Sequence, residues 1–334
     1  MFVYQSDIKN VAEEYNWLKN ETQKTKEVIE SKGFPCVFGV QGHNKQVHFY
    51  SALNYPYNPK DLAEDITDYL KELDKMSPKD RGVSGLLVFF EPIGEMNIHA
   101  KQFMVWKVLS KMKSEYGDQE DNVDDNPLED GYSFLFKNEF WFINFSSNSY
   151  KNRKSRNFGA FITLAMQTLS KSNEYFNSNI KTKAKAQKTV RNLAEKYDGC
   201  PVHSGLGPVI GSGKFSPAKL SYFIGDTNDE KSYEPWRFKE FVPKRIFIDN
   251  TIFENNLKAI SDFQNLYIWG SVETFSKNTN IEYMNSSNIL LTNNAITIDK
   301  FKENINIATF DKNLAAQYHI FNIDYFNDLL ALRY

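Results

Sequence analysis

The sequence predicts an α+β domain over residues 1–240, with a mixed sheet and surrounding helices, and a small α/β domain over residues 241–334. In the first part, apolar runs of strand length alternate with amphipathic helical patterns. Two of these runs are joined by the short turn Lys137-Asn138-Glu139, which predicts an antiparallel hairpin. After the linker-like stretch SYEPWRFKEFVPKR, strand and helix patterns alternate to the end, as is typical of a small α/β domain.

The elements before the hairpin follow from local patterns. A helix over 8–31 has apolar residues at helical spacing and ends at Gly33. The runs 34–40, 46–53 and 85–90 predict strands. Asn58 caps a helix over 58–76 that Pro59 opens, and a further helix covers 99–116.

The later elements are predicted in the same way. The hairpin strands are 132–136 and 140–145, and helices follow at 157–176 and 180–197. In the second part, RIFID, NLYIWGSVE, SNILLTN and YHIFN predict strands. ENNLKAISDF and IDYFNDLLAL predict helices, and another is expected near 297–304 or 311–317.

Composition narrows the class of protein. The 334 residues are 41% apolar and 25% charged, as in soluble globular proteins, and the net charge of −2 gives no indication of a nucleic acid or an anionic membrane as partner. The two cysteines, Cys36 and Cys200, are too few for a disulfide framework. We see no secretory signal, and no run approaches the roughly 18 apolar residues that span a bilayer. We therefore expect a cytoplasmic protein without a membrane partner, and we do not expect it to bind nucleic acid.

Two loops have unusual compositions. The acidic stretch GDQEDNVDDNPLED, residues 117–130, lacks the spacing of a calcium loop and is interpreted as a solvated loop. CPVHSGLGPVIGSGKFS, residues 200–216, comes close to a phosphate-binding motif. However, Gly207 stands seven residues before Lys214 instead of six, and Phe215 occupies the hydroxyl position. We interpret it as a loop that carries a ligand residue, His203, with glycines that allow its turns.

The histidines and cysteines include few candidates for ligands. The five histidines are His43, His48, His99, His203 and His319, and none has the spacing of a zinc-binding helix. His203 lies in a Gly- and Pro-containing loop, where site residues are common. Cys36 lies between Pro35 and an apolar run, which indicates either a buried, inert thiol or a thiolate ligand.

Two further segments carry charge beside predicted elements. In YKNRKSRNFG, residues 150–159, Arg153 and Arg156 lie beside a predicted helix start at Ser155 or Asn157. Cations and free backbone amides there would form a receptor for a carboxylate or a propionate, and a solvated basic turn is the alternative. Glu91 follows an apolar run, where a carboxylate is either exposed at the strand end or paired with a cation such as a guanidinium.

Four motifs, in this order, are similar to motifs of the YqcI/YcgG family: GFPCVFG (33–39), LLVFFEP (86–92), RKSRNFGAF (153–161) and YDGCPVHSGLG (197–207). The resemblance spans about residues 10–226. It implies a haem-dependent enzyme, because the characterised proteins that resemble this family N-hydroxylate guanidino groups of arginine or related guanidines in natural-product biosynthesis. It thereby implies a haem iron that activates dioxygen and has an axial protein ligand.

The resemblance also implies roles for individual residues. His203 falls on a family histidine and would be the iron ligand or a distal group, with Cys36 as the alternative ligand. Arg153, Arg156 and Asn157 would hold haem propionates or a substrate carboxylate.

Two more positions bear on the active site that the resemblance implies. Glu91 would pair with the guanidinium of a substrate. Tyr150 stands where family members often carry a histidine, five residues before the serine of SRN. If that histidine is the iron ligand, this chain has a tyrosinate-bound haem or no haem.

The second part is similar to a BRCT-type domain, in the turn at Gly270 and the final aromatic helix with Tyr325 and Phe326. This resemblance implies interaction with a protein or a nucleic acid, and of these we expect a protein partner or a homo-oligomer formed through that domain. A truncated nuclease-like α/β domain, with Asp249 and Asp299 as its acids, is the alternative.

Two functions follow from these observations. The preferred one is a haem-dependent monooxygenase that N-hydroxylates a guanidino or amine nitrogen of arginine or a related small molecule, with dioxygen as co-substrate and an external electron donor. Glu91 would then orient the cationic substrate. The alternative is a non-catalytic small-molecule-binding or regulatory module whose C-terminal domain recruits a partner, and Tyr150 favours it. We expect the enzyme, because the other motifs are intact.

Overall fold

The computed structural model describes residues 1–122, 126–129, 132–175, 179–207 and 218–237, and five short strands between residues 245 and 322. The chain divides into two compact units, residues 1–93 with 105–237 and residues 94–104 with 238–334. The boundary predicted at residue 240 falls within 238–244, which lie outside the described residues, so it stays a prediction.

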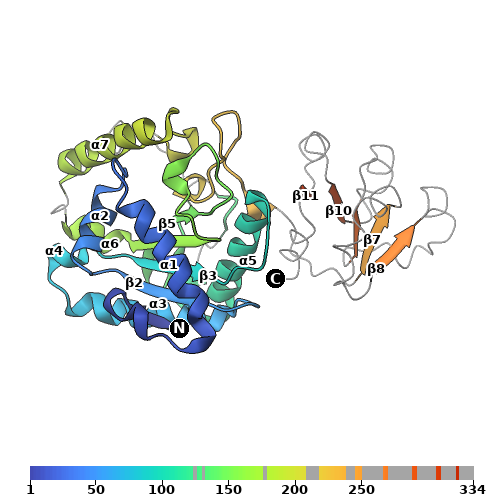
Figure 1. Cartoon of the computed structure of the whole chain (residues 1–334), viewed down its shortest axis with the longest axis horizontal. Coiled ribbons are helices and arrows are strands. Elements are labelled where there is room, and N and C mark those ends of the chain that lie inside the picture. The colour runs from blue at the N-terminus through green and yellow to red at the C-terminus, as the bar shows by residue number, and fades with distance from the viewer. Residues whose placement is uncertain are drawn as a thin grey trace. The chain divides into compact units, whose positions relative to one another are not determined.

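The first unit contains a six-stranded mixed sheet in the order β1-β2-β3-β6-β5-β4 (Figure 1). Strands β2 and β3 are parallel, and the other neighbouring pairs are antiparallel. The predicted α+β fold with a mixed sheet is therefore confirmed for this unit. The strands are β1 (Phe2–Tyr4), β2 (Phe49–Leu53), β3 (Leu86–Phe90), β4 (Leu135–Phe136), β5 (Glu139–Ser146) and β6 (Thr163–Thr168).

Seven helices accompany this sheet in the described part of the chain: α1 (Asn16–Ile29), α2 (Val37–Asn44), α3 (Pro59–Lys75), α4 (Pro78–Arg81), α5 (Ile98–Tyr116), α6 (Leu169–Tyr175) and α7 (Ile180–Asp198). Short 3-10 turns are η1 (Gln5–Asn10), η2 (Glu13–Tyr15), η3 (Gln119–Asn122), η4 (Lys154–Arg156), η5 (Ser204–Leu206), η6 (Ala218–Ser221) and η7 (Pro235–Arg237). Among the residues that the structure describes, no helix combines the length and the apolar character that crossing a membrane requires.

Helices pack on both faces of the sheet. On one face, Leu18 of α1 packs against Tyr50 and Phe89. On the other, Tyr69 of α3 lies 5.6 Å from Phe49 and 6.2 Å from Trp141, measured between ring centroids. Full burial of side chains of this size stabilises the fold by about 1.5–3 kcal/mol each.

Several predicted elements are confirmed nearly to the residue. Helix α3 begins at Pro59, and the Asn58 side chain caps it by accepting a hydrogen bond from the Lys60 amide at 3.1 Å. The β4–β5 hairpin turns through Lys137 and Asn138, whose φ angles of 55° and 57° suit a tight two-residue turn.

The strand predicted at 34–40 is wrong, because this segment leads into helix α2. The Cys36 Sγ caps the helix by accepting from the Gly39 amide at 3.3 Å. A Cβ at Gly42 would lie 2.3 Å from the Val83 carbonyl oxygen, so glycine allows the helix to approach the segment before β3 closely. Close packing against this segment therefore outweighs the strand preference of the apolar run.

The helix predicted at 157–176 is also wrong over most of its length. Residues 163–168 form β6, which pairs with both β3 and β5, and the helical part is confined to α6. Leu, Ala and Met favour a helix locally, but two neighbouring strands supply hydrogen-bond partners for this segment.

Two smaller expectations also change. The helix predicted at 8–31 begins only at Asn16, after the turns η1 and η2. The acidic stretch 117–130 is not wholly solvated, because Asp121 is fully buried. Its carboxylate accepts hydrogen bonds from the amides of Asp118, Lys137 and Asn138 at 2.7–2.9 Å.

The second unit contains a parallel sheet in the order β11-β10-β9-β7-β8. Its strands are β7 (Arg245–Asp249), β8 (Leu266–Trp269), β9 (Asn288–Leu291), β10 (Asn306–Thr309) and β11 (Phe321–Asn322). Of these, β10 falls outside the runs that the sequence predicts as strands. The predicted helices of this part, the Gly270 turn, Asp299, Tyr325 and Phe326 lie outside the described residues, so the BRCT-like assignment stays a prediction.

Candidate functional site

The carboxyl ends of three strands meet at one edge of the first sheet. Strand β6 is antiparallel to both β3 and β5, so β2, β3 and β5 all run in one direction. Asn54 follows β2, Glu91 follows β3 and the motif-bearing segment 147–157 follows β5. Because ligands of open sheets commonly bind outside the carboxyl ends of parallel strands, this edge is the candidate site.

Glu91 is held in place by the segment after β2. Its Oε2 accepts a hydrogen bond from the Tyr55 amide at 2.8 Å, and its backbone carbonyl accepts one from the Tyr57 hydroxyl at 2.7 Å. The Tyr57 φ angle of 39° lies in the left-handed region, which costs a non-glycine residue roughly 1–3 kcal/mol. These contacts orient the carboxylate at the strand end.

Aromatic residues are the neighbours of Glu91: Phe90 precedes it, and Tyr55 and Tyr57 hydrogen-bond to it. The Tyr57 ring lies 5.1 Å from that of Phe90 and 5.6 Å from that of Tyr55, which is 39% exposed. Glu91 itself is partly exposed and forms no ion pair with a described residue. A carboxylate beside exposed aromatic surface is suited to a planar cation such as a guanidinium.

The segment after β5 is anchored by Asp226, a carboxylate that no sequence motif marks. Asp226 accepts hydrogen bonds from the backbone amides of Lys151, Asn152 and Arg153 at 2.9–3.2 Å. The Ser155 amide and hydroxyl donate to the Asp198 carboxylate at 2.6 and 2.7 Å.

The predicted anion receptor is therefore occupied by the chain's own carboxylates. The expected helix start at Ser155 or Asn157 is absent, because η4 is a single 3-10 turn that β6 follows after a short connection.

The buried side chain of Arg153 links its own loop to the segments around Pro201 and Gly225. Its Nε donates to the Gly225 carbonyl at 2.9 Å, and its guanidinium also donates to the Pro201 carbonyl and the Asn228 side chain. The side chain is 2% exposed, so these internal acceptors satisfy it away from solvent.

The side chains of Arg156 and Asn157 also form hydrogen bonds within the protein. The Arg156 guanidinium donates to the Asn144 side chain and to the Ser221 carbonyl, and burial lowers its pKa. The Asn157 side chain donates to the Tyr150 carbonyl at 2.7 Å and accepts from the Gly159 amide at 2.9 Å. Both residues shape the loop internally.

His203 is 1% exposed, and both of its ring nitrogens have partners. Its Nδ1 accepts from the Gly205 amide at 2.9 Å, and its Nε2 donates to the Glu230 carbonyl at 2.8 Å. Burial lowers the pKa of the ring, which favours this neutral form.

Tyr150 and Cys36 are similarly engaged. The Tyr150 hydroxyl donates to the Ile224 carbonyl at 2.7 Å, and the ring is 1% exposed. Cys36 packs beside the cluster of Ile29, Phe34 and Phe158, and burial raises the pKa of its thiol despite the nearby Arg156 charge.

These contacts test whether the predicted residues fit a haem. An axial ligand needs a free nitrogen, thiolate or phenolate, and propionates need free cations. His203 and Tyr150 each use their ligand atom in a hydrogen bond, and the apolar burial of Cys36 favours its neutral thiol. Arg153, Arg156 and Asn157 donate to internal acceptors. In this arrangement the six residues do not fit a haem.

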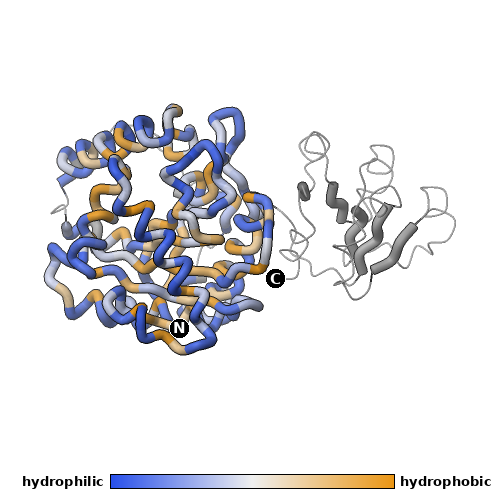
Figure 2. Tube along the Cα trace, in the orientation of Figure 1, coloured by the Kyte–Doolittle hydropathy of each residue, from blue (hydrophilic) through white to orange (hydrophobic). Residues whose placement is uncertain are grey.

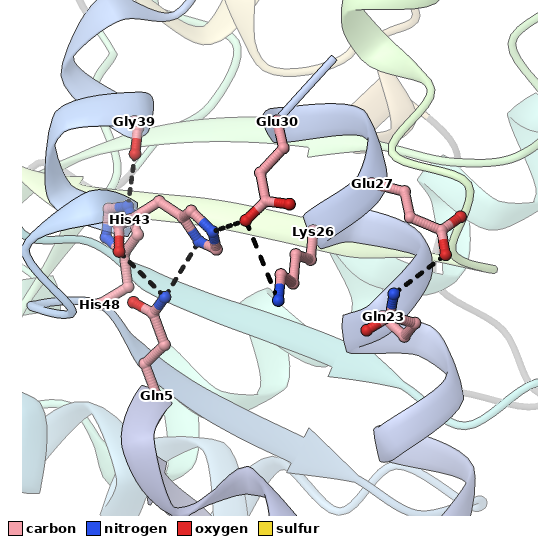
Figure 3. Close-up of polar contacts among 8 residues, drawn as sticks. All are labelled: Gln5, Gln23, Lys26, Glu27, Glu30, Gly39, His43 and His48. Atoms are coloured by element: carbon pink, nitrogen blue, oxygen red, sulfur yellow. Dashed lines mark hydrogen bonds and ion pairs between the residues drawn. The ribbon is translucent and has the colours of Figure 1, made fainter.

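Two other histidines form a separate polar group at the start of the sheet (Figure 3). His43 lies between Gln5 and Glu30: its Nδ1 is 3.0 Å from Gln5 Nε2, and its Nε2 is 3.1 Å from Glu30 Oε1. His48 Nε2 donates to the Gly39 carbonyl at 2.9 Å. These residues link η1, the end of α1, and α2.

The structure thus brings five of the predicted residues together: Tyr150, Arg153, Arg156, Asn157 and His203 share the loops 147–157, 198–207 and 221–230. Glu91 forms no hydrogen bond or ion pair with them in the described part of the chain. Sequence reasoning missed Asp226 and Asn228, and the only available signal was the short polar run DTNDE after an apolar stretch.

Among the described residues, no group of three or more His, Cys, Asp or Glu side chains could hold a metal ion. A comparison with protein-family models matches residues 25–236 to the model described as the YqcI/YcgG family. No curated protein and no solved structure matches the chain.

Proposed function

The chain belongs to the YqcI/YcgG family, and from that premise we propose that its first unit binds a small guanidinium or ammonium compound at Glu91. The observation that carries the proposal is the geometry of Glu91. Its carboxylate is oriented by the Tyr55 amide and forms no ion pair with a described residue, and Tyr55, Tyr57 and Phe90 are its aromatic neighbours. A cationic ligand would form an ion pair with the Glu91 carboxylate and contact the neighbouring aromatic side chains.

In this proposal the first unit is a binding module that holds no haem at the residues predicted to bind one. The residues that the resemblance assigns to haem hold the loops together by internal hydrogen bonds. Replacing those bonds with an iron ligand would leave buried polar groups without partners, at a cost of roughly 1–3 kcal/mol each. Recruitment of a partner by the second unit is part of the same proposal.

Haem-dependent N-hydroxylation of a guanidino or amine nitrogen is the second candidate, and family membership favours it. When bound, the haem would supply the activation of dioxygen, with electrons from an external donor. Glu91 would have the same role in either case, because it would orient the cationic nitrogen.

Calorimetric titration of the full-length protein with arginine, agmatine and guanidinium chloride tests the ligand class. Glu91→Gln keeps an oxygen that can accept from the Tyr55 amide and removes only the charge. We expect the variant to bind roughly 10- to 100-fold more weakly, as for loss of a charged hydrogen-bond partner. Glu64→Gln, at an exposed position of α3, is the matched control and should bind as the unmodified chain does. Equal affinities of the Glu91→Gln variant and the unmodified chain would refute the assignment.

An absorption spectrum after expression with a haem supply separates the two candidates. The binding module predicts no Soret band after desalting, with or without dithionite and carbon monoxide. A Soret band that shifts with carbon monoxide would establish the second candidate, and its loss in His203→Ala or Tyr150→Phe would then identify the ligand.

A further inference from the structure

Helix α7 carries a continuous basic face. Lys181, Lys185, Lys188 and Lys196 are all exposed, and at 100° per residue they fall within an arc of about 80°. None of the four forms an ion pair with a described residue. Figure 1 shows α7 along the outside of the first unit, and Figure 2 shows hydrophilic residues along its length.

The opposite side of α7 is fixed to the unit. Tyr197 packs 6.0 Å from the Phe34 ring, and its hydroxyl lies 3.0 Å from Ser31 Oγ. The Arg191 guanidinium donates to the carbonyls of Leu206 and Gly207. Because these contacts hold the apolar side of the helix, α7 cannot roll to insert that side into a lipid surface.

The acidic residues of α7 do not neutralise this face by ion pairs. Glu195 accepts from the Val202 amide at 3.2 Å, and Asp198 accepts from Ser155. Lys154, next to Ser155, is exposed near the carboxyl end of the helix.

The residue types on this face indicate which polyanion it fits. Thr182, Thr189 and Asn192 are exposed among the lysines. Lys, Thr and Asn side chains are common donors to nucleic-acid phosphates. Among the side chains of α7 that the structure describes, none on this face is an exposed aromatic or large apolar residue, which a protein–protein contact would use as an anchor.

We propose that this face of α7 binds the phosphodiester backbone of a nucleic acid, independently of sequence. Lys181 and Lys196 are fifteen positions apart, which spans about 22 Å along the helix, enough for several successive phosphates. The net charge of −2 does not reveal this surface, because it sums over the whole chain, whereas basic residues outnumber acidic ones on α7. The inference is independent of the ligand proposed for Glu91.

Fluorescence anisotropy of labelled duplex DNA and single-stranded RNA, each about 20 nucleotides long, tests the proposal at salt from about 50 to 200 mM. We expect the full-length chain to bind both and the logarithm of the affinity to fall linearly with the logarithm of salt. The triple variant Lys181→Gln, Lys185→Gln, Lys188→Gln should bind at least about tenfold more weakly at the lowest salt, with a slope smaller by about 2–3.

A second triple variant has the same change in charge on another helix. Lys60→Gln, Lys71→Gln and Lys75→Gln remove lysines of α3 that each pair with a carboxylate three or four residues away, and this variant should bind as the unmodified chain does. Failure of the unmodified chain to bind either nucleic acid would overturn the proposal, as would equal binding by the α7 variant. Binding to phosphatidylserine vesicles, but not to DNA or RNA, would assign the face to a lipid surface instead.

Discussion

At the scale of single residues, His48 sets part of the response of the first unit to pH. Its ring is 5% exposed, donates to the Gly39 carbonyl and accepts from the Gly85 amide at 3.1 Å. Burial lowers its pKa to about 4, from an ordinary value of 6.5, so the folded protein holds the ring neutral. As pH falls, the unfolded chain takes up this proton first.

We therefore predict that the free energy of unfolding decreases as pH falls from about 6.5 to about 4, with a share for His48 of roughly 3 kcal/mol. Urea denaturation at intervals of pH measures this dependence. His48→Gln should lower the free energy of unfolding at neutral pH, and it should remove the share of the pH dependence that is due to His48. The lowered pKa of His203 still makes stability fall with falling pH in this variant. An unchanged slope in the variant would contradict the assignment to His48.

At the scale of elements, Asp226 anchors the loop after β5 to the segment 218–233. Six hydrogen bonds reach its two oxygens, five from the backbone amides of residues 151–153 and one from the Asn152 side chain, counting bifurcated bonds separately. Tyr150 and Arg153 then bind the neighbouring carbonyls of Ile224 and Gly225. The loop thus has its conformation fixed by a segment about 75 residues away in sequence.

Asp226→Asn should lower the free energy of unfolding by about 1–2 kcal/mol, because an amide nitrogen replaces one of the two acceptor oxygens in a partly exposed site. Urea denaturation gives the magnitude, and hydrogen exchange should show faster exchange at the amides of residues 151–153. Asp229→Asn, at an exposed position three residues later, is the matched control. Equal stability and equal exchange in the two variants would show that the loop does not depend on Asp226.

The elements that could be predicted from sequence are those whose signals are local. The Asn58–Pro59 cap defines α3, and the turn at Lys137 and Asn138 defines the hairpin. Strand β6 could not be predicted in this way, because its state depends on pairing with β3, about 75 residues earlier, and β5. The same holds for α2, whose helical state accompanies the close approach of Gly42 to Val83.

At the scale of the whole molecule, the sequence located the loops of the candidate site but not what they contact. Two of the four family motifs, 153–161 and 197–207, converge, as the clustering of Arg153, Arg156 and His203 shows. Their partners, Asp226 and the carbonyls of residues 221–230, carry no motif. A list of candidate ligands from sequence therefore includes residues whose polar atoms are already engaged by the fold.

The two compact units each contain their own sheet, so we predict that the chain does not unfold in one two-state transition. Of the five tryptophans, only Trp269, in β8, lies in the second unit. Tryptophan fluorescence during urea denaturation should show two transitions, and Trp269→Phe should remove the amplitude of one while leaving the midpoint of the other unchanged. A single transition, coincident by fluorescence and circular dichroism, would refute independent units.

The strand order of the first sheet has a consequence for synthesis on the ribosome. Strand β6 is made after β5, yet it lies between β3 and β5. Once β3 has left the ribosome, the edge of β3 that later pairs with β6 stays open until residue 168 has also emerged. Such an open strand edge can pair with any other extended chain. Because the central strand β6 is synthesised late, the rate of translation and the chaperones that bind the nascent chain affect how this protein folds.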